Sequence, residues 1–289
     1  MALDCSKATS ELENIICKSD SLKQDEMQME KAYFSLRKNL GPIGQKKLLT
    51  MQRAWLAFRS DMIVESAISE EIETHTQFLK NTPAGMVPFK RQTTLKKMDR
   101  FLTGYNFPNP STPVQRNFSK MLKRILNQTV GDPEYKGSEE VDASDIKRND
   151  KFILSARIYS DGFYGGAHPL HSSVHINIDV KTGNPLKISH LFSKQAQRKI
   201  ALACAVQLAQ GRTAYEKDTA LATFNAYQED YPNQITNHIK DASRWQFGKT
   251  ETTISFNEYA IAPYVAGEQR CSFENTYLAP LSKRPEFFK

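Results

Sequence analysis

The feature that most constrains the fold of this chain is a change of hydrophobic period on either side of a proline-rich segment. Residues 107–113 contain three prolines, and proline interrupts both helices and the interior of sheets. Before this segment apolar residues recur every three or four positions, and after it they alternate with polar ones. The 289 residues suffice for two domains of ordinary size. We therefore predict a helical domain over residues 1–106 and a mixed domain over residues 107–289.

The first domain has the residue spacing of amphipathic helices. Ser10 is a suitable N-cap for a short first helix, and Gly41-Pro42 ends a second. Two apolar stripes step by three and four residues: Met29, Tyr33, Leu36 and Leu40, then Leu48, Met51, Trp55, Phe58 and Met62. We expect the two stripes to pack together as an all-α helical hairpin, with the third helix continuing to about Leu79 and a basic helix over 90–102.

The second domain alternates between strand and helix patterns. After a second basic helix over 114–127, residues 152–158 and 174–180 alternate as half-buried strands do, and Ser193 is a candidate N-cap for a further helix. Late strands are expected around 252–256 and 269–274. Pro169 and Pro263 are expected at strand ends, and the rings of Tyr259 and Tyr264 are expected to be buried. The fold class is therefore α+β, with an antiparallel sheet packed by helices.

The charge distribution argues against a nucleic-acid partner. The formal net charge is +7, but residues 90–124 hold nine basic residues and one acid, a net charge of +8, so the rest of the chain is close to neutral. No zinc finger, helix-turn-helix signature or RGG repeat accompanies this basic stretch. No run of eighteen apolar residues occurs, so we predict no transmembrane segment.

The chain has four cysteines, Cys5, Cys17, Cys204 and Cys271. An even count with a local pair twelve residues apart is typical of disulfides, although three connectivities are open and four buried thiols are the alternative. No CxxC pair suggests zinc. The cysteines favour an oxidising compartment, and no signal peptide is visible, so we expect a periplasmic protein whose signal peptide has been removed.

The sequence gives little support to catalysis. His168, His171 and His175 form the densest titratable cluster, and on a strand His171 and His175 would share a face, but no carboxylate stands at a recognisable ligand spacing. The chain has no G-x-S-x-G, P-loop, HExxH or dinucleotide motif. We therefore predict a protein that is not an enzyme, with no catalytic residue, no metal and no cofactor.

The N-terminal stretch resembles the LprI-like lysozyme-inhibitor family over roughly residues 3–80. The resemblance rests on "DCSKATSELENIIC", then Leu22, Asp25, Glu26 and Tyr33, and then "QRAWLAFR" at 52–59. That family usually has another cysteine just after this arginine, where Met62 stands near. Its absence leaves Cys5 and Cys17 to pair with each other or with a distant cysteine.

Roughly residues 115–283 resemble the domain of unknown function that occurs in RsiV-like anti-sigma factors and beside some peptidoglycan deacetylases. The resemblance rests on three blocks in the family's order: "YSDGFYGGAHP", "INIDVKTGNPLKISHLF" and "ISFNEYAIAPYVAG". In the anti-sigma factors this extracytoplasmic domain binds lysozyme, so the resemblance implies binding. Our hypothesis is that a protruding loop enters a hydrolase cleft, with target-binding residues Tyr164, Gly165, Gly166 and His168.

Together the two resemblances predict a periplasmic immunity protein that sterically blocks a peptidoglycan-cleaving enzyme. The expected partner is a lysozyme-like or amidase effector of an antagonistic system such as type VI secretion, because a basic inhibitor would be repelled by a cationic lysozyme unless its contact face were acidic. The alternatives are a general lysozyme inhibitor, and a cell-envelope sensor or accessory module that binds peptidoglycan or a partner protein without inhibiting it. The sequence leaves the oligomeric state open.

Overall fold

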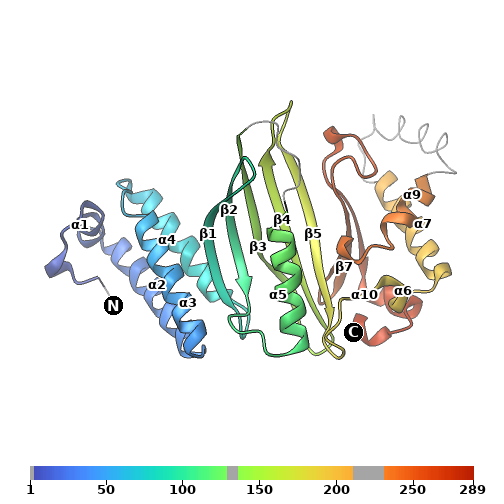
Figure 1. Cartoon of the computed structure of the whole chain (residues 1–289), viewed down its shortest axis with the longest axis horizontal. Helices are drawn as coiled ribbons and strands as arrows, with labels where there is room; N and C mark the ends of the chain where they lie inside the picture. Colours follow the sequence, from blue (N-terminus) through green and yellow to red (C-terminus); the bar gives the residue numbers. More distant parts are fainter. Residues whose placement is uncertain (1–2, 129–135, 211–230) are drawn as a thin grey trace. The chain divides into compact units, whose positions relative to one another are not determined.

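The chain forms two compact units in a computed structural model that describes residues 3–128, 136–210 and 231–289 (Figure 1). One unit takes in residues up to Arg91 together with Thr103–Pro110, and the other takes in Gln92–Leu102 together with residues from Ser111 onward. The helical N-terminal region is followed by sheet, so the predicted α+β class is confirmed. Among the described residues, no helix has the length and apolar character needed to cross a bilayer.

The first unit is a set of helices, the first of which begins at the predicted cap Ser10. A 3-10 turn at Cys5–Lys7 precedes α1 (Glu11–Lys18), α2 (Asp20–Lys38), α3 (Pro42–Phe58) and α4 (Glu65–Lys80). Ser10 caps α1 in a capping box with Glu13, because the two side chains satisfy each other's backbone N–H groups. Proline follows the Gly41 cap at the start of α3.

The predicted third helix is wrong in its length, because α3 ends at Phe58 and α4 is a separate helix. The hydroxyl of Ser60 donates to the Ala57 carbonyl and lies 3.1 Å from an Asp61 carboxylate oxygen. Short polar side chains of this kind compete with helical backbone hydrogen bonds and favour a turn. The chain therefore breaks after one apolar stripe and returns as α4.

The apolar stripes meet in a core centred on Trp55, which is 1% exposed. Its indole N–H donates to Glu71 at 2.8 Å, and its ring stacks on that of His75 with centroids 3.9 Å apart. Arg59 lies against the same indole and pairs with Glu26. Leu22, Leu48, Ile68 and Ile72 complete the packing.

The predicted basic helix over 90–102 is wrong, because the segment is a β-hairpin of β1 (Val87–Leu95) and β2 (Met98–Asn106). The two-residue turn is Lys96-Lys97, with Lys96 at φ +56°. The central residues of two-residue hairpin turns need positive φ, and Asn-Gly or Asp-Gly usually occupies them. Neither dipeptide is present here. The lysines and arginines of this segment have a spacing that is compatible with a helix. Lys96-Lys97 is not a turn motif that the sequence makes recognisable.

The second unit is built on a sheet with the strand order β1-β2-β3-β4-β5. Strands β3 (Gly137–Asn149), β4 (Ile153–Phe163) and β5 (Leu170–Asp179) pair antiparallel. Helix α5 (Pro113–Leu126) lies across one face of this sheet and buries Phe118, Leu122 and Leu126 (Figure 1). Thr112 caps α5 and Pro113 opens it, so the predicted second basic helix is confirmed.

The C-terminal part of the second unit forms its own core beside a small antiparallel sheet of β6 (Trp245–Phe247), β7 (Glu251–Phe256) and β8 (Gln269–Glu274). The helices around it are α6 (Ile188–Leu191), α7 (Lys194–Gln210), α9 (Tyr231–His238) and α10 (Asn275–Leu278), and single 3-10 turns complete the chain. Trp245, Phe247, Ile254 and Phe256 are fully buried here. The Phe247 amide donates to the Ser155 hydroxyl, which ties β6 to β4.

The four cysteines form two disulfides, Cys5–Cys17 and Cys204–Cys271, which leaves no free thiol among the residues described. The first closes a loop at the start of the helical unit, with a sequence separation of 12. The second joins α7 to β8 inside the C-terminal core, with a sequence separation of 67.

Removing the disulfides should destabilise the two units unequally. On the chain-entropy relation, replacing Cys5 and Cys17 by Ala costs about 3 kcal/mol, and replacing Cys204 and Cys271 costs about 4 kcal/mol because the closed loop is longer. Denaturant unfolding of the two double variants, each against wild type, checks this order. Equal losses, or a larger loss for the N-terminal pair, would contradict it.

The protein should also lose stability on acidification, through His75. Burial lowers the pKa of His75 to about 3, and its Nε2 lies 2.9 Å from the Gln52 amide oxygen. Between pH 6.5 and 3 the unfolded chain binds a proton at this site that the folded chain excludes. The free energy of unfolding should therefore fall as the pH drops, by up to about 1.4 kcal/mol per pH unit from this group. Urea unfolding at several pH values, with His75→Gln expected to flatten the slope, measures the effect; an unchanged slope in the variant would rule it out.

Candidate target-binding site

The loop predicted to bind the target joins β4 to β5, and its backbone requires glycine. Gly165 has φ +80° and Gly166 has φ +149°, both in the region that residues with a side chain rarely adopt. A Cβ atom at Gly166 would meet nothing within 4 Å. Conformation, and not crowding, therefore makes glycine necessary at Gly166.

Tyr164 supports this loop from beneath, because its side chain is 4% exposed. Its hydroxyl donates to Glu139 at 2.5 Å, and the same carboxylate pairs with Arg100. Arg100 and Glu139 are each 1% exposed, and Arg100 also donates to the carbonyls of Leu126 and Gln128 at the end of α5. The buried network of Tyr164, Glu139 and Arg100 thus fixes the base of the loop to β2, β3 and α5. Tyr164 therefore anchors the loop. A direct contact of Tyr164, Gly165, Gly166 and His168 with a target stays a prediction.

His168 is held by a second loop that follows β7. One ring nitrogen, Nδ1, lies 2.9 Å from the Pro169 carbonyl and must carry the proton, so in the neutral ring Nε2 accepts from the Tyr259 hydroxyl at 2.9 Å. The ring also stacks on Tyr264, with centroids 3.5 Å apart. We call the group His168, Tyr259, Tyr264 and Val265 the two-loop surface.

The expectation that Tyr259 and Tyr264 bury their rings is wrong. Tyr259 is 60% exposed and has φ +62°, an uncommon conformation for a residue with a large side chain. Tyr264 is half-buried, and Val265 beside it is 92% exposed. These contact candidates were not predicted from the sequence, although they lie within the block "ISFNEYAIAPYVAG". An aromatic pair close to glycine and proline in a loop was the available signal.

Side chains of the second loop also cover the free edge of β5. Glu258 accepts from both the backbone N–H and Nδ1 of His171, at 3.1 and 2.7 Å, and Asn257 accepts from the Ser173 amide at 2.9 Å. An edge strand with unpaired N–H groups invites pairing with another chain, and these side chains satisfy the donors instead. The two loops are therefore tied together as one rigid surface.

The three histidines considered for a metal do not converge. His168 stacks on Tyr264, His171 binds Glu258, and His175 is buried and lies 2.9 Å from the Ser243 carbonyl. Burial lowers the pKa of His175 to about 4, so its ring is neutral near pH 7. In the part of the chain that the structure describes, no group of three or more His, Cys, Asp or Glu side chains is arranged to hold a metal ion.

The sheet beside the loop is acidic. Glu140, Asp161 and His171 lie directly opposite one another on β3, β4 and β5. The Asp161 side chain is 48% exposed, and Glu140 and Asp142 are exposed. The overall basic charge of the chain therefore does not describe the charge next to the two-loop surface.

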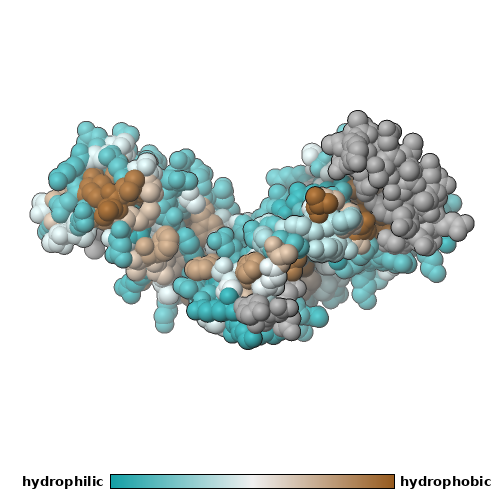
Figure 2. All heavy atoms as spheres, turned by 90° about the horizontal axis from the view of Figure 1, so that it is seen from above, coloured by the Kyte–Doolittle hydropathy of each residue, from teal (hydrophilic) through white to brown (hydrophobic). Residues whose placement is uncertain are grey.

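The helical unit offers a second candidate surface, a groove of about 650 Å³ between α2 and α3. Its walls include three exposed apolar side chains, Phe34 (46%), Leu49 (37%) and Leu56 (42%), beside the exposed Arg37 and Arg53. Figure 2 shows hydrophobic residues gathered on the helical part of the surface. Leu49 and Leu56 lie seven residues apart and off the core stripe, a spacing that indicates a second apolar strip on the same helix.

Breaking the buried network should destabilise the second unit. Glu139→Ala leaves the Arg100 charge buried without its carboxylate and should cost about 3–5 kcal/mol. Tyr164→Phe removes one hydrogen bond to a carboxylate and should cost about 1.5–3 kcal/mol. Urea unfolding measures both, with Tyr277→Phe as the matched control because its ring is 44% exposed. A Tyr164→Phe loss no larger than that of the control would contradict the anchoring role.

Comparison with known proteins gives a family match for the N-terminal part and matches to solved structures at low sequence identity. No curated protein matches the chain. One solved structure is a DUF3298 family member from Bacteroides fragilis NCTC 9343, 14% identical, covering 70% of this chain and 95% of that chain, with a TM-score of 0.49. Another is a DUF3298 family protein from Pseudomonas aeruginosa PAO1, 15% identical, covering 71% and 97%, with a TM-score of 0.42.

The RsiV-like resemblance of residues 115–283 stays a prediction. The N-terminal resemblance is confirmed: residues 5–95 match the family described as "Lysozyme inhibitor LprI".

Proposed function

We propose that this protein acts outside the cytoplasm as an inhibitor that binds a lysozyme-type peptidoglycan hydrolase and blocks its cleft sterically. The observation that carries the proposal is the match of residues 5–95 to a lysozyme-inhibitor family. The two disulfides support a location in an oxidising compartment, for which we propose the periplasm. Inhibition of this kind needs no chemistry from the inhibitor.

The contact we propose is made by the loop at Gly165, Gly166 and His168 together with the rest of the two-loop surface. Tyr259 and Val265 present apolar area at little cost in conformational entropy, because hydrogen bonds and ring stacking already hold this surface. Exposed tyrosines of this kind are frequent anchors of protein interfaces. A pre-organised loop on a rigid sheet suits insertion into a concave site.

The target we propose is a muramidase effector delivered by a competing cell, with this protein as the producer's immunity protein. A cationic lysozyme is a second candidate, because Glu140, Asp142 and Asp161 make the sheet beside the two-loop surface acidic. Opposite charges at the contact raise the association rate, and this effect weakens as salt screens it. Association with a cationic lysozyme should therefore slow as salt is added, and association with a neutral or acidic effector should not.

The test is inhibition of peptidoglycan lysis by a lysozyme-type muramidase, with the hydrolase encoded beside this protein and a cationic lysozyme as the two targets. Wild-type protein should bind and inhibit at least one of them. Replacing Tyr259 by Ala should weaken inhibition by about tenfold or more, the size expected for an interface anchor worth 1.4 kcal/mol or more. Binding measured by surface plasmon resonance should weaken in parallel through faster dissociation.

Tyr277→Ala, a similarly exposed tyrosine of the same unit, is the matched control and should inhibit like wild type. Leu56→Asp tests the groove of the helical unit in the same assay. Loss of inhibition with Leu56→Asp and not with Tyr259→Ala would move the contact to the helical unit. Absence of both binding and inhibition for every target would reject the inhibitor function and favour an envelope accessory module, which sedimentation with purified peptidoglycan would then detect.

A further inference from the structure

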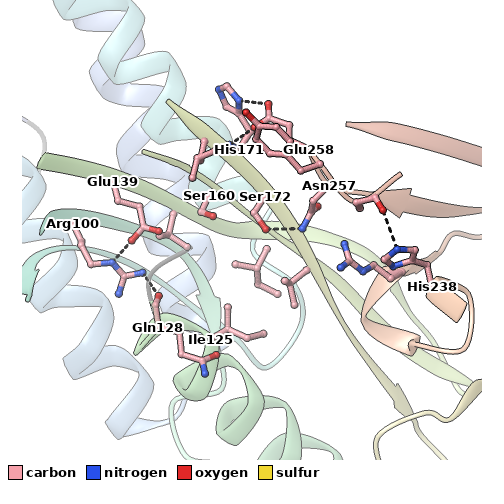
Figure 3. A pocket seen from close by; sticks show the side chains of 17 residues that line it. Arg100, Ile125, Gln128, Glu139, Ser160, His171, Ser172, His238, Asn257 and Glu258 are labelled. Carbon is pink, nitrogen blue, oxygen red and sulfur yellow. Dashed lines mark hydrogen bonds and ion pairs between the residues drawn. The ribbon is translucent and has the colours of Figure 1, made fainter. Parts of the chain in front are cut away.

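The second unit contains a pocket of about 500 Å³ whose wall includes Tyr259 of the two-loop surface (Figure 3). It extends from the buried Arg100 and Glu139, past the end of α5, to Asn257 and His238. Its volume lies within the range of small-molecule sites. Apolar side chains form much of its wall: Val141, Ile158, Leu170 and Val174.

The charged groups around this pocket have partners, with one exception among the described residues. Arg100 pairs with Glu139, and Glu258 pairs with His171. Arg244 also lines the pocket, and its Nη1 is shielded from solvent without any hydrogen-bond acceptor. No carboxylate in the part of the chain that the structure describes lies within 4.0 Å of this guanidinium. A buried guanidinium nitrogen without an acceptor carries a free-energy cost, and the charge of this guanidinium has no carboxylate to neutralise it.

Arg244 is held in place by its neighbours in the chain. Asp241 caps the 3-10 turn Ala242–Arg244, and the buried Trp245 that follows donates its indole N–H to the Ile239 carbonyl at 2.8 Å. The backbone on both sides of Arg244 is therefore fixed. A positioned cation of this kind costs little reorganisation when a ligand binds.

Two other polar side chains of the pocket, Asn257 and His238, already have hydrogen-bond partners. The amide of Asn257 accepts from the Ser173 backbone and donates to the Ser172 hydroxyl, at 2.9 and 2.8 Å. His238 directs Nε2 to the Ala260 carbonyl at 3.1 Å, so this nitrogen is a donor. Among the charged side chains of the pocket, the Arg244 guanidinium is therefore the group to which an anion would bind, beside an apolar wall.

We propose that this pocket binds a small carboxylate that carries a short apolar group, with Arg244 as its anion-binding residue. The planar guanidinium fits a carboxylate with two parallel hydrogen bonds, which gives both strength and orientation. The apolar group of the ligand lies against Ile158, Leu170 and Val174. Free organic acids and the carboxyl ends of short peptides share this chemistry. Arg244 itself lies outside the two-loop surface proposed to bind the hydrolase.

The experiment titrates the full chain with three probes followed by two-dimensional NMR of backbone amides. The probes are isovalerate, acetyl-D-alanyl-D-alanine and the carboxamide of that peptide. At least one acid should produce saturable shifts at Asn257–Ala260 below about 20 mM. The carboxamide should bind at least about tenfold more weakly than its acid, because it lacks the charge. Binding by isovalerate alone indicates a free acid as ligand, and binding by the peptide acid indicates a peptide end.

Arg244→Gln should weaken the acid at least about tenfold, and Arg244→Lys should retain part of the affinity because it keeps the charge without the fork. Arg198→Gln, the same charge change at an exposed position of α7, is the matched control and should bind like wild type. Thermal unfolding shows whether each variant is folded. No saturable binding by either acid, equal binding of acid and carboxamide by wild type, or undiminished binding by a folded Arg244→Gln would each overturn the proposal. Inhibition by Arg244→Gln should equal that of wild type, which keeps this test separate from the hydrolase assay.

Discussion

The ion pair of Arg100 and Glu139 is the interaction on which the second unit's surface features depend. Both side chains are almost fully buried, so neither charge is tolerable without the other. The pair brings together β2, β3 and the end of α5, and the Tyr164 hydroxyl adds the base of the β4–β5 loop. One carboxylate thereby fixes the loop proposed to meet a target and one end of the pocket proposed to bind an acid.

In both units, buried charged or polar groups have partners, but the groups that are paired differ. In the helical unit the core ring of Trp55 lies between His75, which burial keeps neutral, and Arg59, which Glu26 neutralises. In the second unit Glu258 and Asn257 occupy the donors of an edge strand, which blunts that edge against pairing with another chain. Arg244 departs from this pattern, which is why it points to a ligand.

Much of the fold could be predicted because apolar residues recur every three or four positions in its helices and every second position in its strands. The cap at Ser10 and the basic stretch over 114–127 predicted helices that are present, and the stripe through Trp55 predicted a helix that is present but shorter than expected. The hairpin at Lys96 could not be predicted, because a non-glycine residue adopts positive φ there without a turn motif. The loop was predicted from its glycines, but the burial of Tyr164 and the exposure of Tyr259 depend on contacts with residues 25 and 91 positions away. Arg244 shows no local pattern, since its missing partner is a property of the folded pocket.

Hydrogen–deuterium exchange of the protein with and without a bound hydrolase tests the central claim most directly. The account predicts that binding slows exchange at backbone amides of residues 164–168 and 259–266, since both segments of the two-loop surface lose solvent and mobility in the complex. The helices within residues 5–95, which do not touch the hydrolase in this account, should keep the exchange rates of the free protein. Protection confined to α2 and α3, or no change at either loop in a complex that still inhibits, would contradict the account.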